Sequence, residues 1–160
     1  MIKTKNKKVI NFTAQIFILV LSIFYLIYRP FFITKVVGRS MWPSYSEGQI
    51  LVATSLDKNY SIGDVVLIRH EEEILIKRVA YVPGQKILCA NLGWREFCPI
   101  PPIKNIDRQV KYLNTHGVHA FIYEIPKEHV FVIGDNETES EDSRNFGSIP
   151  YSEVLAKIIE

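Results

Sequence analysis

Residues 65–81 read VVLIRHEEEILIKRVAY, two apolar runs separated by a short charged segment. Valine, isoleucine and leucine dominate both runs, which favours extended chain. The pattern therefore predicts a strand from Val65 to Arg69, a hairpin tip at His70 to Glu73, and a returning partner strand from Ile74 to Tyr81. This hairpin indicates an antiparallel β fold.

Similar short runs, bounded by turn residues such as Ser61-Ile62-Gly63-Asp64 and Val82-Pro83-Gly84-Gln85, lie on both sides of the hairpin. The further expected strands are Phe31 to Val37, Gln49 to Ala53, Lys86 to Leu88, Val118 to Tyr123, Val130 to Ile133 and Val154 to Ile159. Few windows longer than ten residues carry a helical period. The sequence thus predicts a mainly β domain of coiled antiparallel sheets over residues 31–160. A loop-rich insertion is expected at about 89–127, irregular from Asn91 to Gly117.

The N-terminal segment has a different composition. Four lysines lie within residues 1–8, and the mostly apolar residues 9–28 carry no charge. Twenty helical residues span roughly 30 Å, the thickness of one hydrocarbon core. The lysines favour a cytoplasmic N-terminus, which would place residues 31–160 on the outer side of a cell membrane. We therefore expect a cytoplasmic basic tail and one transmembrane helix.

Two other interpretations of this segment are weaker. A cleaved signal peptide would need a shorter apolar core and a small-residue cleavage site, but Arg29-Pro30-Phe31-Phe32 follows. A buried core helix would not explain the lysines before it.

Composition limits the remaining possibilities. A chain of 160 residues is long enough for one domain with a real core. The formal net charge of +2, with no basic block after residue 8, gives nucleic-acid binding no support. No metal-ligand motif is present, since His70-Glu71-Glu72-Glu73 lacks the second histidine of HExxH. We expect no cofactor and no metal.

The chain has two cysteines, Cys89 and Cys98, whose spacing does not match a CxxC pair. On the outer side of a membrane they could form a disulfide closing a loop of about ten residues, worth on the order of 2–3 kcal/mol. Two unpaired buried thiols are the alternative.

Lys77 is the first candidate for chemistry. In a strand it shares a face with Leu75 and Val79, whereas Arg78 shares the other with Ile76, so one of two adjacent cations must lie toward apolar surface. Lys77 could simply extend its amine to water at a sheet edge. A desolvated amine would instead have a lowered pKa and could take a proton from a serine hydroxyl.

Two other stretches could complete a site with Lys77. Residues 38–44 read GRSMWPS and place Ser40 between a glycine and an apolar pair, although a lone serine is usually a surface hydroxyl. Residues 134–147 read GDNETESEDSRNFG and combine short hydroxyls with one arginine among acids. An isolated stretch of that kind is usually a solvated loop.

Together these pieces resemble bacterial type I signal peptidases, membrane-anchored Ser–Lys proteases with a mostly β catalytic domain. The matches follow the family's order and cover nearly all of the chain. The four matching boxes are Ser40-Met41-x-Pro43, then Gly63-Asp64-Val65-Val66, then Lys77-Arg78-Val79 with Pro83-Gly84, and finally Gly134-Asp135-Asn136 with Ser140-x-Asp142-Ser143-Arg144 and Gly147.

The resemblance implies a role for each residue. Ser40 is the expected nucleophile, with its backbone N–H as oxyanion donor, and Lys77 is the general base, oriented by Ser140. Two structural ion pairs are implied, and two side chains would line shallow pockets for small substrate residues. The ion pairs are Asp135 with Arg78 and Asp142 with Arg144, and the pocket residues are Met41 and Ile76.

The sequence departs from the family pattern at three positions. Gly38 stands where some members have a serine that supplies a second oxyanion donor. Ser44 replaces the usual threonine, and Glu137 stands where arginine is common. None of these changes touches Ser40 or Lys77.

The resemblance implies a hydrolase that removes signal peptides from exported pre-proteins after Ala-x-Ala, with pre-protein signal peptides and a lipid bilayer as partners. Other hypotheses stay open. A Ser-His-Asp hydrolase would need one of four histidines that lack motif context, and repressor-type Ser–Lys proteins carry a DNA-binding domain instead of an anchor. A conjugative-transfer signal peptidase for pilin-like substrates and a non-catalytic membrane-tethered β module that binds peptides are the remaining alternatives.

Overall fold

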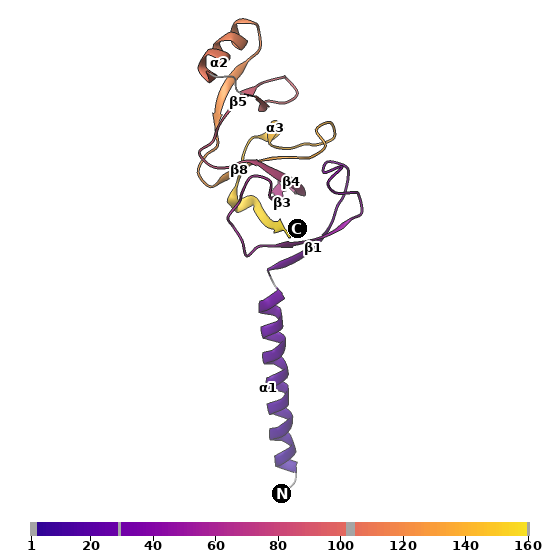
Figure 1. Cartoon of the computed structure of the whole chain (residues 1–160). Helices are drawn as coiled ribbons and strands as arrows, with labels where there is room; N and C mark the ends of the chain where they lie inside the picture. The colour runs from indigo at the N-terminus through magenta and orange to yellow at the C-terminus, as the bar shows by residue number, and fades with distance from the viewer. Residues whose placement is uncertain (1–2, 29, 102–104, 160) are drawn as a thin grey trace.

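A computed structural model describes residues 3–28, 30–101 and 105–159, and within the N-terminal helix it describes the side chains of residues 14–26. That helix, α1 (Lys3–Tyr28), projects from the β1 end of a β domain (Figure 1). A smaller lobe that carries helix α2 lies at the opposite end of the molecule.

The main sheet has seven strands in the order β1-β2-β10-β3-β4-β8-β9, and all its pairings are antiparallel. Its strands are β1 (Phe31–Lys35), β2 (Ile50–Thr54), β3 (Val65–His70), β4 (Glu73–Tyr81), β8 (His129–Ile133), β9 (Ile149–Pro150) and β10 (Val154–Ile158). The expected hairpin is confirmed: β3 and β4 pair from Val65 opposite Arg78 to His70 opposite Glu73. This hairpin lies near the centre of the sheet and separates two buried clusters, one around Met41 and Leu67 and the other around Val66 and Val132. The predicted mainly β fold is therefore correct.

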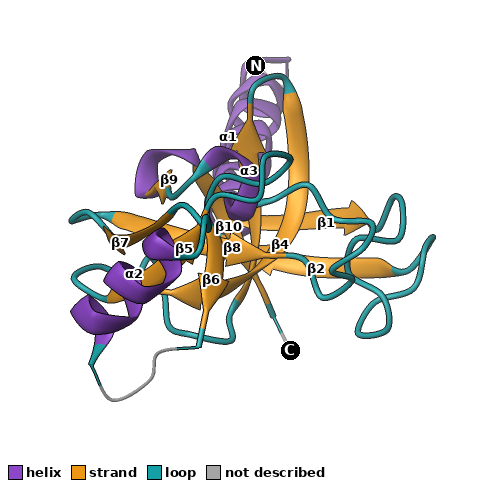
Figure 2. Cartoon of the chain, turned by 90° about the horizontal axis from the view of Figure 1, so that it is seen from above, coloured by secondary structure: helices purple, strands orange, loops and turns teal. Residues whose placement is uncertain are grey.

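The insertion is more ordered than expected. It forms a second sheet in the order β6-β5-β7, from β5 (Lys86–Ala90), β6 (Cys98–Ile100) and β7 (Ala120–Glu124), beside helix α2 (Ile106–Thr115) (Figure 2). The expectation of irregular chain from 91 to 117 was therefore wrong. Asn105 caps α2 by accepting a hydrogen bond from the Arg108 N–H at 2.9 Å, a signal readable in the sequence. None of its residues is fully buried, although its apolar side chains gather on one face.

The expected disulfide is also corrected, because both cysteines are free thiols. Strand register gives the reason: Cys89 lies opposite Pro99, whereas Cys98 lies opposite Ala90. Directly opposed residues of an antiparallel pair point to the same face and neighbours along a strand alternate. The two sulfur-bearing side chains therefore point to opposite faces of the small sheet, which a disulfide cannot bridge.

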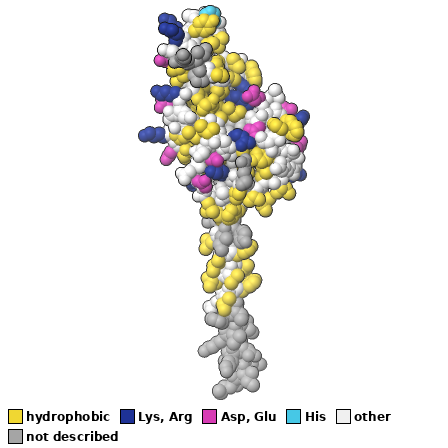
Figure 3. Space-filling view, in the orientation of Figure 1, with side chains coloured by type: hydrophobic (Ala, Val, Ile, Leu, Met, Phe, Trp, Pro, Cys, Tyr) yellow, Lys and Arg dark blue, Asp and Glu magenta, His cyan; other side chains and the backbone are white. Residues whose placement is uncertain are grey.

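Large apolar side chains of α1, from Ile16 to Leu26, are exposed and cover the described part of the helix (Figure 3). In the part of the chain that the structure describes, no helix meets the length and apolarity needed to cross a membrane. The side chains of residues 1–13 and 27–29 lie outside the described residues. The transmembrane helix at 9–28 and the basic tail at 1–8 thus stay predictions.

Candidate active site

Ser40 lies in the turn that connects β1 to β2. The turn is closed by the Trp42 N–H donating to the Arg39 carbonyl at 3.1 Å and the Tyr45 N–H donating to the Met41 carbonyl at 2.9 Å. Met41 is buried in the core and anchors the turn. Ser40, the preceding residue, is half-buried and faces a cleft.

Lys77 lies in β4, opposite Val66 of β3. Its side chain is only 2% exposed, so it does not extend to bulk water. Burial lowers the pKa of its amine below the ordinary value; Asp142 raises that pKa, Arg144 lowers it and Glu141 raises it, and the net direction is downward. The desolvated-amine interpretation of the sequence therefore agrees with the structure.

Ser40 and Lys77 open into the same cleft, which has a volume of about 360 Å³. Its walls come from the turn before Ser40, from the β3–β4 hairpin and from the loop after β8. The other lining residues are Val37, Gly38, Arg39, His70, Glu71, Glu73, Leu75, Glu139 and Glu141. The tertiary structure thus brings together three stretches that are far apart in the sequence.

Asp142 organises the loop after β8, and its side chain is fully buried. Its carboxylate accepts hydrogen bonds from the Gly134 N–H at 2.9 Å, from Ser140 Oγ at 2.7 Å, and from Arg144 Nε and Nη2 at 2.9 and 2.7 Å. Burial by itself raises the pKa of Asp142, but these donors outweigh it and hold the pKa below its ordinary value. The expected pair of Asp142 with Arg144 is present.

Ser140 is buried, and its hydroxyl donates to Asp142. Among the described residues, no hydrogen bond joins the Lys77 amine to Ser40 or Ser140. Because Ser140 Oγ uses its proton on Asp142, its lone pairs stay available to accept a hydrogen bond from an amine.

The same loop also holds the backbone of the turn that carries Ser40. The Asn136 N–H donates to the Ser40 carbonyl at 2.9 Å, and Asn136 Nδ2 donates to the Arg39 carbonyl at 3.0 Å. Gly134 packs between this turn and Ser140, because a Cβ there would overlap Ser140 Oγ and lie 2.6 Å from the Ser40 carbonyl oxygen. Only glycine fits at this position.

Arg78, on the opposite side of β4 from Lys77, forms the second expected ion pair. Its Nε and Nη2 donate to the two carboxylate oxygens of Asp135 at 2.9 and 2.7 Å, and Nη1 donates to the Gly63 carbonyl at 2.8 Å. Burial raises the pKa of Asp135, but hydrogen bonds from Arg78 and Ser44 lower it further than burial raises it. Asp135 thus connects β4 with the loop after β8 and, through Ser44, with the turn that carries Ser40.

Met41 and Ile76, the expected pocket residues, line a second cavity of about 160 Å³ that adjoins Ser40. This cavity lies between residues 34–37, at the end of β1 and just beyond it, and residues 74–76 of β4. On the side of β4 away from β3, pairing with β8 begins only at Arg78. The strand therefore has an unpaired edge over residues 74–77 in the described sheet, beside Ser40.

Gly38 has a φ of +77°, a conformation that favours glycine, and open space surrounds its Cα. A serine at this position would fit sterically but with backbone strain. Glycine at this position offers no side-chain hydroxyl that could serve as a second oxyanion donor.

The structure also shows features that the sequence did not reveal. His70 lines the cleft, but its ring stacks on Phe146 at 3.9 Å, and no hydrogen bond joins it to Ser40 among the described residues. Arg95, from the insertion, reaches the loop that carries Ser140. No group of histidine, cysteine and acidic residues suited to a metal ion occurs among the residues described.

Comparison with known proteins gives one family match. The model of the family described as signal peptidase, peptidase S26, matches residues 9–93 and 101–159. The match thus covers most of the chain, and residues 94–100 fall in the gap between its two segments.

Named relatives come from bacteria and from mitochondria. The mitochondrial ATP-independent inner membrane protease subunit 1b of Arabidopsis thaliana is 33% identical over an alignment of 135 residues, which covers 80% of this chain and 68% of that protein. Signal peptidase I of Bacillus caldolyticus is 29% identical over 142 residues, covering 77% and 74% of the two chains. Signal peptidase I V of Bacillus subtilis is 28% identical over 137 residues, covering 78% and 81%.

Proposed function

The chain belongs to the peptidase S26 family of signal peptidases and is a serine peptidase; from this premise we propose that it cleaves exported pre-proteins with a Ser40–Lys77 dyad. The observation that carries the proposal is the buried Lys77 amine in the cleft that Ser40 also lines. A lysine is rarely buried without a partner unless its neutral form has a use.

In the proposed first step, the neutral Lys77 amine takes the Ser40 hydroxyl proton as Oγ attacks the scissile carbonyl carbon. The Ser40 backbone N–H donates to the oxyanion that forms. When the tetrahedral intermediate collapses, the C–N bond breaks, and the Lys77 ammonium gives its proton to the leaving amine. An ester between Ser40 and the signal peptide remains.

In the second step, Lys77 takes a proton from a water that attacks the ester carbonyl. The C–O bond to Ser40 then breaks, and the ammonium returns a proton to Oγ. Ser140 orients the base: its hydroxyl donates to the buried Asp142, so its oxygen can accept from Lys77 and direct the amine lone pair toward Ser40. Asp142 is in turn fixed by Arg144.

The unpaired edge of β4 supports an extended substrate. A peptide that adds a strand beside residues 74–77 would bring its scissile carbonyl to Ser40. The cavity lined by Met41 and Ile76 is small, about 160 Å³, which suits a short apolar side chain better than a large one. We propose Ala-x-Ala as the cleaved motif, and the small cavity supports this for one of its two alanines.

We also propose that α1 anchors the enzyme in a membrane with its N-terminus in the cytoplasm. The helix has 26 residues, and its large apolar side chains from Ile16 to Leu26 are exposed. The relatives named inner membrane proteases are consistent with this location. Recovery of the full-length protein in the soluble fraction after alkaline carbonate extraction would contradict the anchor.

The decisive experiment compares single variants of the full-length enzyme in detergent, using a pre-protein with an Ala-x-Ala site and N-terminal sequencing of the products. We expect Ser40→Ala to abolish cleavage and Lys77→Ala to lower kcat/KM by roughly 10²- to 10⁴-fold. Ser46→Ala and Lys86→Ala, on exposed residues outside the cleft, are the matched controls. Full activity of Lys77→Ala would refute the dyad, and binding without cleavage by the wild type would favour a non-catalytic module.

Product sequencing also separates the two enzymatic hypotheses. Cleavage of many unrelated pre-proteins after Ala-x-Ala supports a general signal peptidase. Cleavage restricted to pilin-like precursors would instead support the conjugative-transfer alternative.

A further inference from the structure

Arg95 projects from the insertion lobe into the loop that follows β8. Its side chain is 7% exposed, and Nη2 donates to two main-chain carbonyls, that of Glu137 at 2.6 Å and that of Ser140 at 3.0 Å. The guanidinium also lies 4.5 Å from the centre of the Trp94 ring. One buried cation therefore holds both ends of a four-residue segment that terminates at Ser140.

This cation suits the segment it holds. Residues 137–141 place three glutamates on a short loop, and all three side chains are exposed. Repulsion between the three carboxylates favours an open, solvated loop. In addition, the part-buried carbonyl of Glu137 and the buried carbonyl of Ser140 would be unfavourable without hydrogen-bond donors. A guanidinium beneath the backbone offsets both effects, because it supplies positive charge and donors in a fixed geometry.

The position of Arg95 leaves one of its own hydrogen-bond donors unsatisfied. Its Nε is buried and has no hydrogen-bond partner among the described residues. A buried donor left unpaired is unfavourable, so the side chain is not placed to satisfy its own hydrogen bonds. Local cost of this kind is typical of residues placed for a functional reason.

Contacts lead from Arg95 to the turn that carries Ser40 in three steps. Arg95 fixes the Ser140 carbonyl, and the Ser140 side chain lies against Gly134. Gly134 packs on the Ser40 carbonyl oxygen, so displacement of Ser140 would reach the nucleophile turn. Two further bonds attach the same lobe segment to the loop: the Phe97 N–H donates to the Arg144 carbonyl at 2.9 Å, and Asn145 Nδ2 donates to the Trp94 carbonyl at 3.3 Å.

We propose that Arg95 is a positioning residue, through which the insertion lobe holds Ser140, and thereby the Lys77 amine, in the geometry for peptide cleavage. The inference rests on the proposed function. It adds to the family pattern, because residues 94–100 lie in the gap between the two matched segments. The lobe thus serves the active site, not only the stability of its own small sheet.

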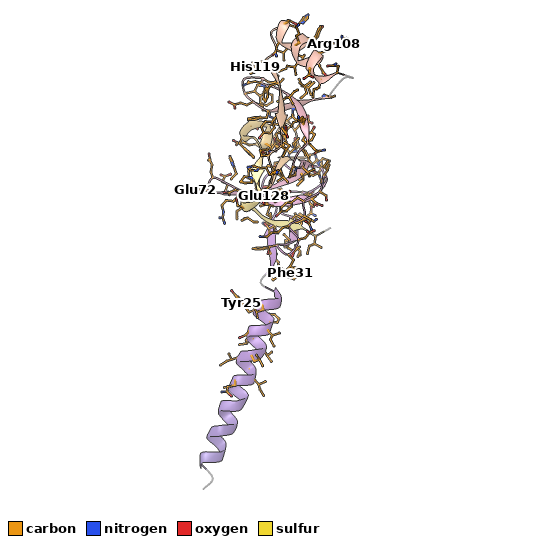
Figure 4. The ribbon with its side chains drawn as sticks, turned by 90° about the vertical axis from the view of Figure 1, so that its left-hand side faces the viewer. Tyr25, Phe31, Glu72, Arg108, His119 and Glu128 are labelled. Atoms are coloured by element: carbon orange, nitrogen blue, oxygen red, sulfur yellow. The ribbon has the colours of Figure 1, made fainter. Side chains whose placement is uncertain are left out.

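The test compares Arg95→Met, Arg95→Lys and Arg108→Met in the full-length enzyme. Arg108 lies on α2 of the same lobe, far from the β3–β4 hairpin marked by Glu72 (Figure 4), and is exposed. Its replacement removes the same charge without touching the loop. We expect Arg95→Met to lower kcat by on the order of ten- to a hundredfold with little change in KM. Arg95→Lys, which keeps charge and donors, should be partly active, and Arg108→Met should match the wild type.

A pH profile distinguishes positioning from mere stability. If Ser140 is released, water reaches Lys77, and the rising limb of kcat/KM should move to higher pH in Arg95→Met. Asp142, Arg144 and Glu141, the other charged groups that affect Lys77, are unchanged in this variant. A lower melting temperature with unchanged kcat and unchanged profile would overturn the proposal, as would equal losses in Arg95→Met and Arg108→Met.

A second measurement does not need peptidase activity. The pKa of Lys77 follows from the pH dependence of its reaction with an amine-specific reagent, read by mass spectrometry of the peptide that contains it. We expect a higher value in Arg95→Met than in the wild type, and an unchanged value would refute the positioning role. If Lys77→Ala still cleaves, the proposed function fails while this comparison still decides the role of Arg95. If Arg95→Met does not fold, the pH profile of kcat/KM and the pKa of Lys77 are measured on Arg95→Lys instead, with smaller shifts expected in the same direction.

Discussion

Gly134 leaves no room for a side chain, because a Cβ there would lie 2.6 Å from the carbonyl oxygen of Ser40. The loop that carries Ser140 and the turn that carries Ser40 are therefore in direct backbone contact. The absence of a side chain at Gly134 lets the two segments approach this closely.

Gly134→Ala should consequently damage activity more than stability. The added methyl group must push either Ser140 or the Ser40 turn aside, at a cost of about 1–3 kcal/mol. We expect kcat to fall on the order of a hundredfold, since small displacements of reacting groups are expensive. Gly63→Ala, where φ is +98° and nothing lies within 4 Å of a Cβ, provides a control for backbone strain without the clash. Equal loss of activity in both variants would contradict this explanation.

The rate of cleavage should rise with pH through the lowered pKa of Lys77, because only the neutral amine can accept a proton. Glu141 raises that pKa, so Glu141→Gln should move the rising limb of kcat/KM to lower pH. Glu124→Gln, whose carboxylate pairs with Lys86 in the small sheet, is the charge-matched control. A shift to higher pH in Glu141→Gln, or a flat wild-type profile between pH 6 and 10, would be inconsistent with Lys77 as base.

Lys77→Met should make the inactive protein more stable than the wild type at neutral pH. The folded pKa of Lys77 lies below the unfolded value of about 10.4, so between these two values the unfolded chain binds a proton that the folded chain does not. The free energy of unfolding of the wild type therefore rises with pH between the folded and the unfolded pKa of Lys77. Below the folded pKa the amine is charged in both states, and the folded protein is destabilised by the full cost of burying that charge. Methionine removes this cost while filling the same space. Thermal melts of both proteins at pH 7 and pH 10 test this, and a lower melting temperature of Lys77→Met at pH 7 would contradict it.

The two ion pairs should differ in their contribution to folding. Asp142→Ala leaves Arg144 buried without its carboxylate, which costs about 3–5 kcal/mol. Asp135→Ala should cost less, about 1.5–3 kcal/mol, because Arg78 is partly exposed and keeps its bond to the Gly63 carbonyl. Urea unfolding of the two variants measures the difference, and equal costs would show that burial does not separate the pairs.

The Asp142 carboxylate also predicts a pH dependence of stability. Its pKa is lower in the folded chain than in the unfolded chain, so its stabilisation is present above the unfolded value of about 3.9. That stabilisation is lost as pH falls through the folded pKa. The wild type should therefore lose stability below about pH 4 more steeply than Asp142→Ala.

Both cysteines should react as free thiols once the protein is unfolded without reductant. In the folded protein burial raises the pKa of Cys89 to about 12, so this thiol should be nearly inert at neutral pH. Cys98 is partly exposed and should react faster with a thiol reagent. Mass spectrometry after labelling counts the modified residues, and recovery of fewer than two labels after unfolding would indicate a disulfide.

The sequence by itself determined the elements that depend on local pattern. Alternation and turn residues located the β3–β4 hairpin, and the order of the boxes around Ser40, Lys77 and Asp142 identified the family. Helix α2 was missed because it has only ten residues and follows a stretch with three prolines that is typical of irregular chain, although Asn105 marks its start. The disulfide was predicted wrongly because spacing along the chain does not reveal which face of a strand a cysteine occupies.

Only the tertiary structure decided which of two adjacent cations is buried and what surrounds it. A strand pattern places Lys77 and Arg78 on opposite faces. In the folded chain the Lys77 side chain is buried near Asp142 and Arg144 of the loop after β8, whereas Arg78 stays partly exposed. Gly134 contacts Ser40, and Arg95 donates a hydrogen bond to the Ser140 carbonyl. Both contacts join residues that are far apart in the sequence, so local sequence patterns do not predict them. The sequence thus supplied the reacting groups, whereas long-range packing supplied the desolvation and the geometry on which their chemistry depends.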